Sequence, residues 1–167
     1  MDLKKFKVKA NRNKQHLTAF LKKLDEVVPE GMQGIVAEED IKVWTATDCT
    51  SCANCCKTMT PTFTKKDITR IAAHLGMTAK EVFTRWLERE EGTGDIINRS
   101  LPCQFLVDDK CSIYAVRPED CAGFPHHDKK PFDAYNDVYI QNVHRCPATY
   151  TLVSLLKKRI ERDFEWE

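Results

Sequence analysis

The chain has 167 residues, a formal net charge of +1 at pH 7 and eight cysteines. This length suffices for one hydrophobic core without cross-links, so we expect a single domain over residues 1–167. The near-neutral charge disfavours nucleic acid as a partner, and no apolar run reaches the roughly 18 residues of a membrane-spanning helix. No apolar stretch typical of a secretory signal is present either, so we expect a cytoplasmic protein whose thiols stay reduced.

Two helices are expected before the cysteine-rich segment. Residues 14–28 place apolar side chains at helical spacing, with lysines and acids on the other face, and Pro29 ends the pattern. Residues 33–45 show a weaker helical pattern. We interpret the basic segment 4–14 as a solvated, frayed terminus in preference to an RNA or DNA contact.

Two short helices joined by a tight turn are expected after this segment. The first covers residues 65–75, because Thr64 and Asp67 have the spacing of a capping box and a glycine follows. The second repeats this device from about residue 79 and continues until the glycines at 92 and 94. Trp86 falls in its apolar stripe, which favours a place in the core over a cofactor platform.

A β-hairpin is expected over residues 101–114. Apolar residues flank a polar turn at Asp108 and Asp109, and turn chemistry explains these two acids more simply than acid–base catalysis does. The hairpin would place Cys103 and Cys111 on neighbouring strands, close enough to share a metal.

The C-terminal third is expected to be irregular and then helical. Residues 117–125 predict one helical turn with Pro118 at its first position, and residues 138–143 predict a short strand. Pro147 starts an amphipathic helix over about 148–163. The expected fold is therefore mainly α, a small helical domain with a short β-hairpin and cysteine-rich metal-binding loops.

Half of the cysteines fall within the string CTSCANCC, as Cys49, Cys52, Cys55 and Cys56. Thiolates at this density are typical of zinc or iron–sulfur sites, because C-x-x-C lets two sulfurs converge on one centre across a turn. Cys49, Cys52 and Cys55 have the C-x-x-C-x-x-C spacing that begins the cluster-binding run of bacterial ferredoxins. Adjacent Cys55 and Cys56 cannot easily bind the same ion, so we expect one of them to serve a second site or to stay unligated.

The other four cysteines are Cys103, Cys111, Cys121 and Cys146. Eight cysteines divide naturally into two sites of four sulfurs, with the hairpin pair completed by Cys121 and Cys146. Two alternatives stay open. Cys121 or Cys146 taken alone could be a small buried core residue, and a disulfide network is possible in principle but disfavoured in a reduced compartment.

Other polar residues near the cysteines could assist a metal. Imidazole can replace sulfur at zinc, but we interpret His126, His127 and His144 as surface residues. Arg117 could donate hydrogen bonds to cysteine sulfur or to backbone carbonyls, or form a surface ion pair. No catalytic residue is assigned.

Three segments together form one specific motif: C-x-x-C-x-x-C-C at 49–56, CQFLVDDKCSIYAVRPEDCAGFP at 103–125, and Cys-Pro at 146–147. This motif resembles the YkgJ-type cysteine-cluster family of zinc- or iron-chelating domains. The family often has an arginine where this chain has Ala122. Members are often labelled Fe–S oxidoreductases, and flagellin lysine methylases carry a similar cluster. The resemblance implies metal ligation by Cys49, Cys52, Cys55, Cys56, Cys103, Cys111, Cys121 and Cys146.

We therefore expect a metal-binding protein that holds an iron–sulfur cluster, zinc, or one of each, in up to two metal sites. An iron–sulfur form would be a redox-active oxidoreductase with an unidentified protein or redox partner. The alternatives are a protein-modifying enzyme related to the flagellin methylases and a zinc-stabilised interaction module. The enzyme is disfavoured because no G-x-G-x-x-G motif follows a strand to hold a nucleotide-like cofactor.

Overall fold

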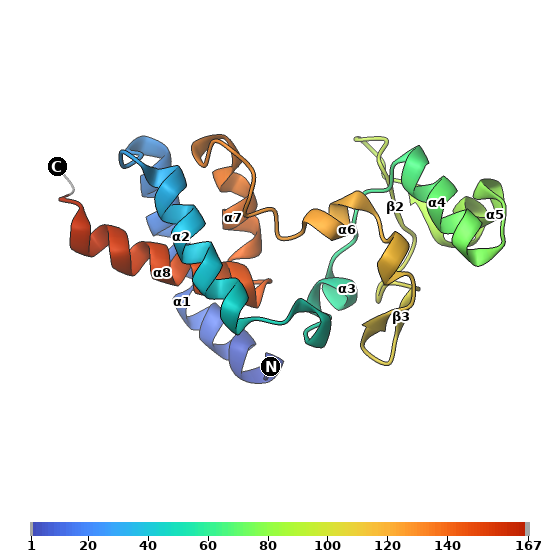
Figure 1. Cartoon of the computed structure of the whole chain (residues 1–167), viewed down its shortest axis with the longest axis horizontal. Helices are drawn as coiled ribbons and strands as arrows, with labels where there is room; N and C mark the ends of the chain where they lie inside the picture. The colour runs from blue at the N-terminus through green and yellow to red at the C-terminus, as the bar shows by residue number, and fades with distance from the viewer. Residues whose placement is uncertain (1, 166–167) are drawn as a thin grey trace. The chain divides into compact units, whose positions relative to one another are not determined.

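The computed structural model describes residues 2–165 and is mainly α-helical, as the sequence predicts (Figure 1). The chain divides into two compact units. Unit 1 is formed by both ends of the chain, up to Asp48 and from Pro125 onward, and unit 2 is Cys49–Phe124. The expectation of a single domain over residues 1–167 stays a prediction.

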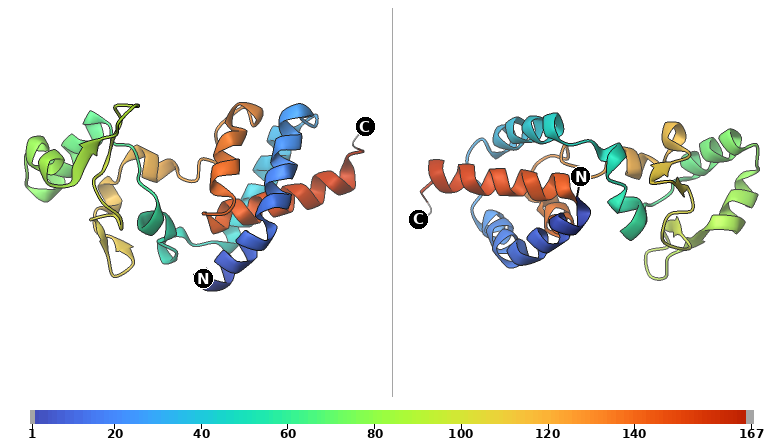
Figure 2. Two further views of the ribbon diagram at one scale, coloured as in Figure 1. Left: turned by 180° about the vertical axis from the view of Figure 1, so that it is seen from behind. Right: turned by 90° about the horizontal axis from the view of Figure 1, so that it is seen from below.

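Helices build unit 1. They are α1 (Leu3–Glu26), α2 (Met32–Ala46), α7 (Asn136–Asn142) and α8 (Pro147–Asp163), with a short 3-10 turn η3 (Asp133–Tyr135) before α7. Helix α8 lies between α1 and α2 and contacts both (Figure 2). Fully buried side chains fill the space between the helices: Leu21, Leu24, Val36, Val43, Leu152, Leu156 and Ile160. The predicted helices at 33–45 and 148–163 are confirmed, with Pro147 in the first turn of α8.

Helix α1 begins at Leu3, so the interpretation of residues 4–14 as a frayed terminus was wrong. The Asp2 carboxylate accepts hydrogen bonds from the backbone N–H groups of Lys4 and Lys5, both at 3.0 Å, and so caps the helix. Phe6 is buried, and its ring packs edge-on against Tyr150 with 5.8 Å between centroids. The lysines of this segment therefore lie on the solvent side of an anchored helix.

The short strand expected at 138–143 was also wrong, because these residues lie in and just after helix α7. Tyr139, Asn142 and Val143 are all buried, and their spacing of three and four residues is that of one helix face. The Tyr139 hydroxyl donates a hydrogen bond to the His127 carbonyl at 3.0 Å. Tertiary burial thus overrides the β-propensity of this segment.

Shorter elements build unit 2. In chain order they are η1 (Cys49–Ser51), α3 (Asn54–Thr58), α4 (Lys65–Leu75), α5 (Ala79–Trp86), β1 (Leu87–Arg89), β2 (Ile96–Asn98), β3 (Leu106–Val107), β4 (Lys110–Cys111), η2 (Tyr114–Val116) and α6 (Glu119–Gly123). Strand β1 pairs antiparallel with β2, and β3 pairs antiparallel with β4.

The predicted helix at 65–75 is confirmed with both of its end signals. Thr64 and Asp67 form a reciprocal capping box, and Gly76 adopts the left-handed conformation (φ 66°) that ends the helix. Helix α5 has the second capping box, at Thr78, but it ends at Trp86 and not near residue 91. There the chain turns into β1, and the Arg99 guanidinium donates hydrogen bonds to carbonyls of the last helical turn and of Leu87.

A hairpin is confirmed within residues 101–114, with β3 and β4 joined by Asp108 and Asp109. The expectation that Cys103 lies on a strand was wrong, because β3 begins only at Leu106. Both aspartates have positive φ, 48° and 61°, as a two-residue turn of type I′ requires. The Lys57 ammonium lies 2.6 Å from the Asp109 carboxylate and so connects the hairpin to α3.

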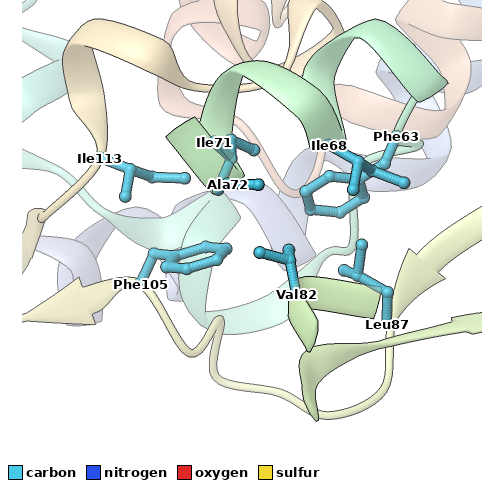
Figure 3. Packing of buried hydrophobic residues seen from close by; sticks show 8 residues of the cluster. All are labelled: Phe63, Ile68, Ile71, Ala72, Val82, Leu87, Phe105 and Ile113. Atoms are coloured by element: carbon cyan, nitrogen blue, oxygen red, sulfur yellow. The ribbon is translucent and has the colours of Figure 1, made fainter. Parts of the chain in front are cut away.

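One apolar cluster forms the core of unit 2 between α4, α5 and the hairpin (Figure 3). Its buried members are Phe63, Ile68, Ile71, Ala72, Val82, Leu87, Phe105 and Ile113. Trp86 is partly buried against this cluster and packs edge-on against Phe105, in agreement with the core role expected for it. Cys103 and Cys111 pack against its border. Within residues 2–165, no helix has both the length and the apolar character needed to cross a membrane.

Candidate metal centre

The first four cysteines lie on two consecutive short helical turns. Cys49 opens η1, Cys52 follows it, and Cys55 and Cys56 lie in α3. The Cys52 N–H donates a hydrogen bond to the Cys49 carbonyl at 3.1 Å. Ala53 adopts a left-handed conformation (φ 51°), which bends the chain between the turns. This is the bent backbone that overlapping C-x-x-C motifs need to aim several sulfurs at one point.

Backbone hydrogen bonding brings the later cysteines of unit 2 to the first group. The Cys103 N–H donates to the Cys56 carbonyl at 2.8 Å, so these two residues are tied together across a long stretch of sequence. Cys111 ends β4, the strand that lies beside η1.

Two carboxylates hold helix α6, which carries Cys121. The Glu119 N–H at the start of this helix donates to the buried Asp67 carboxylate at 3.2 Å. The Asp120 carboxylate accepts from the Thr62 N–H at 3.0 Å. Sequence analysis assigned Asp67 only a capping role, whereas it also fixes the backbone next to a candidate ligand.

Neighbouring thiols contribute to the pKa shifts of four thiols of unit 2: Cys55, Cys56, Cys103 and Cys121. Burial raises the pKa of Cys121 to about 12, and negative charge on Cys55 and Cys103 adds to the effect. Burial also raises the pKa of Cys103. It raises the pKa of Cys52 as well, with a smaller contribution from Cys55. These cysteines come from both halves of the motif.

Cys55 is the thiol of this group that ionises first. A hydrogen bond with the Cys56 side chain lowers the pKa of Cys55 to about 7, against the opposing effect of burial. The same hydrogen bond raises the pKa of Cys56 far above its ordinary value. The Cys56 S–H therefore donates to the Cys55 thiolate, and the adjacent pair shares one proton near neutral pH.

The chemistry of this donor set fits zinc or iron. Several buried thiolates repel one another, and a bound cation removes that repulsion and allows them to ionise together. All eight cysteines are present as thiols and not as disulfides. Within the described part of the chain, no three His, Cys, Asp or Glu side chains stand at the distances of a formed metal site. Ligation by the eight cysteines stays a prediction.

Cys146 belongs to unit 1, whereas the other seven cysteines belong to unit 2. It is buried just before α8, where its N–H donates to the Asn142 carbonyl and its own carbonyl accepts from the Tyr150 N–H. Its assignment to a second site with Cys103, Cys111 and Cys121 is therefore a prediction about how the two units combine.

His127 is buried, so its interpretation as a surface residue was wrong. Its Nδ1 lies 2.7 Å from the Asp40 carboxylate, and its Nε2 lies 2.9 Å from the Thr149 hydroxyl. The imidazole also stacks on Tyr139, with 5.6 Å between ring centroids. Both ring nitrogens are engaged inside unit 1, which leaves this histidine no nitrogen for a metal.

The remaining polar candidates near the cysteines are His126, His144 and Arg117. His126 and His144 are partly buried. Arg117 donates to the Tyr114 carbonyl at 2.7 Å, and its guanidinium lies 3.9 Å from the centroid of the Tyr114 ring. Of the roles considered for Arg117, the contact with a backbone carbonyl is therefore the one observed.

Comparison with known proteins identifies a family and one similar sequence. A family model named CxxCxxCC and described as "putative zinc- or iron-chelating domain" matches residues 48–146. An uncharacterized protein from Methanocaldococcus jannaschii is 37% identical over 81 residues, which cover 47% of this chain and 43% of that protein. The chain thus matches less than half the length of this curated relative. No solved structure is similar to the chain. Because the family match covers more than half of the chain and contains all eight cysteines, the chain belongs to the CxxCxxCC family of zinc- or iron-chelating domains.

Proposed function

We propose that the protein binds zinc or iron through cysteine thiolates, in a centre shared between the two halves of the motif. The mutual influence of Cys55, Cys103 and Cys121 supports this proposal, because these thiols come from α3, the hairpin and α6. If the cysteines were divided in sequence order, with one site from residues 49–56 and another from residues 103–146, the influence of Cys55 on Cys103 and Cys121 would have no role in metal binding.

The pair Cys55 and Cys56 determines how binding begins. The pKa of Cys55 is lowered to about 7 by its hydrogen bond with Cys56, so part of this thiol is ionised at neutral pH and can bind a cation. Cys56 should lose its proton only when a bound cation stabilises its thiolate, because its hydrogen bond with Cys55 raises its pKa. Metal uptake should therefore release protons and weaken as the pH falls below 7.

The metal decides between two functions. Iron would give a redox-active Fe–S protein, since the cluster supplies one-electron transfer and needs an oxidising or reducing protein partner. Zinc would give a stabilised interaction module, because tetrahedral zinc with four thiolates is closed to substrate. The small core of unit 2, with eight buried apolar residues, favours a stabilising role for whichever metal binds.

Paired variants in one short segment test the proposal. Cys55→Ser should reduce the metal retained by anaerobically purified protein by at least tenfold, because serine oxygen is a poor replacement for a soft thiolate. Ser51→Ala, a few residues away in η1, is the matched control and should retain the wild-type amount. A brown anaerobic protein containing iron would favour the redox function, and a colourless protein with stoichiometric zinc the stabilising one. Equal metal content in both variants would contradict ligation by Cys55.

Cys146→Ser tests the predicted eighth ligand separately. As a ligand, Cys146 should lower metal retention when it is replaced, in the same direction as Cys55. As a core thiol of unit 1, it should change the stability of the fold and leave the metal content unchanged.

A further inference from the structure

Asn98, at the end of β2, is a buried polar residue next to the candidate ligands that sequence analysis did not single out. Only 5% of the residue is exposed, and its strand pairs it with fully buried Leu87. Its backbone N–H donates to the Thr60 hydroxyl at 2.9 Å, so the main chain is held independently of the side chain. An amide in such a place needs partners for both its oxygen and its nitrogen.

The orientation of the Asn98 amide is fixed by its neighbour Gln104. The Gln104 Nε2 donates to the Asn98 Oδ1 at 3.0 Å, which leaves the two N–H groups of Nδ2 for the opposite side. Among residues 2–165, Nδ2 is buried without a hydrogen-bond partner. The Asn98 side chain favours the ionised form of the nearby Cys103 thiol, whose pKa burial raises.

This arrangement suits a thiolate and not a thiol. A thiol is a weak acceptor, so the buried donor is poorly satisfied while Cys103 is protonated. A thiolate accepts N–H bonds strongly, and such bonds orient a sulfur ligand and adjust how much charge it gives to the metal. Reversing the amide would turn Oδ1 toward the negative sulfur and would also break the contact with Gln104.

We propose that Asn98 is a positioning residue of the metal centre, whose Nδ2 donates a hydrogen bond to the Cys103 thiolate when zinc or iron is bound. This inference rests on the proposed function, because it needs Cys103 to be a ligand. For an iron centre the same bond raises the reduction potential, since hydrogen bonds to sulfur stabilise the more negative, reduced state.

Two variants of Asn98 separate this role from simple filling of space. Asn98→Asp keeps the size and the acceptor oxygen for Gln104 but removes the donor, and Asn98→Leu removes both polar groups at similar volume. Asn142→Leu is the matched control, because Asn142 is an equally buried asparagine (5% exposed) in unit 1. Far-UV circular dichroism verifies the fold of each variant, and Asn98→Asp decides the test if Asn98→Leu does not fold.

The measurement is zinc affinity by competition with a chromophoric chelator, together with the thiolate charge-transfer spectrum of the Co²⁺-loaded protein. Both Asn98 variants should bind zinc about 10- to 100-fold more weakly than wild type and show a shifted Co²⁺ spectrum, whereas Asn142→Leu should change neither. Wild-type affinity and an unshifted spectrum in folded Asn98→Asp would overturn the inference and leave the proposed function intact. A wild-type protein that binds neither Zn²⁺ nor Co²⁺ would overturn the proposed function and this inference with it.

Discussion

Units 1 and 2 are stabilised by different interactions. Unit 1 packs long helices around many fully buried aliphatic side chains, so apolar burial alone can stabilise it. Unit 2 surrounds a core of eight residues with short helices and two-residue strands, which capping boxes, tight turns and side-chain hydrogen bonds hold in place. Cys103 and Cys111 lie at the border of that core. Burial and the charge of neighbouring thiolates oppose the ionisation of Cys103 and Cys121. We therefore expect unit 1 to depend on packing for its stability and unit 2 to depend on a bound cation.

Metal removal should produce the largest effect and should act on unit 2 alone. Structural zinc contributes on the order of 10 kcal/mol to the folding of small zinc domains, and unit 2 has little apolar core to replace it. After anaerobic chelation, hydrogen exchange should accelerate across residues 49–124 and stay unchanged in α1 and α8. Equal protection of both units before and after chelation would show that unit 2 is stable without metal.

Leu156→Ala should produce the next largest effect, in unit 1. Leu156 is fully buried on α8, and its truncation leaves a cavity that costs about 2–5 kcal/mol in the free energy of unfolding. Chemical denaturation followed by circular dichroism measures the loss. The metal content of the folded variant should equal that of wild type, and a reduced content would show that packing in unit 1 also supports the metal centre.

Asp67→Asn should destabilise unit 2 by about 2 kcal/mol at neutral pH, since it removes the charge from hydrogen bonds inside the protein. The Asp67 carboxylate is buried, yet its hydrogen bonds with Thr64 and its pairing with Arg70 hold its pKa below the ordinary value. Its contribution is therefore complete above the unfolded pKa of about 3.9 and is lost as the pH falls through the folded value.

Denaturation of wild type and Asp67→Asn across pH 2–7 measures this dependence. The two stability curves should differ at neutral pH and converge in acid. A constant difference over the whole range would show that the ionisation of Asp67 does not contribute to stability.

Thr78→Ala should have the smallest effect. It removes the N-cap of α5 and should cost about 1 kcal/mol, because Thr78 accepts a hydrogen bond from the backbone of the first turn. The metal content should not change, since α5 carries no cysteine. A loss of metal would show that the capping box of α5 also supports the metal centre.

Local chemistry explains which elements could be predicted from the sequence. Capping boxes act within four residues, and two aspartates between apolar residues are sufficient for a tight turn, so α4 and the hairpin follow from nearby residues alone. The end of α5 depends on Arg99. This residue follows the helix by more than ten positions and donates hydrogen bonds to the carbonyls of Thr84 and Leu87 at the helix end. No signal within the segment itself could place that end at Trp86.

Distant contacts also explain the errors in unit 1. The start of α1 depends on Phe6 packing against Tyr150, and α7 depends on Tyr139 being buried near His127. Asp40, His127 and Thr149 come from three separate segments, so the burial of His127 could not be anticipated.

The candidate site was predictable as a set of residues but not as an arrangement. The spacing of the cysteines indicates thiolate chemistry, whereas the mixing of thiols from both halves of the motif depends on the fold of unit 2. The contribution of Asp67 depends on a hydrogen bond from the distant Glu119, and that of Asn98 on a hydrogen bond from Gln104. No spacing pattern in the sequence predicts either bond.

Elemental analysis of the full-length protein, purified and kept without oxygen, tests the central claim most directly. The account predicts zinc or iron in at least a one-to-one ratio with the chain, together with thiols that react with a thiol reagent only after the metal is removed. Protein without zinc or iron, whose seven thiols in unit 2 react at once while both units stay folded, would contradict this claim.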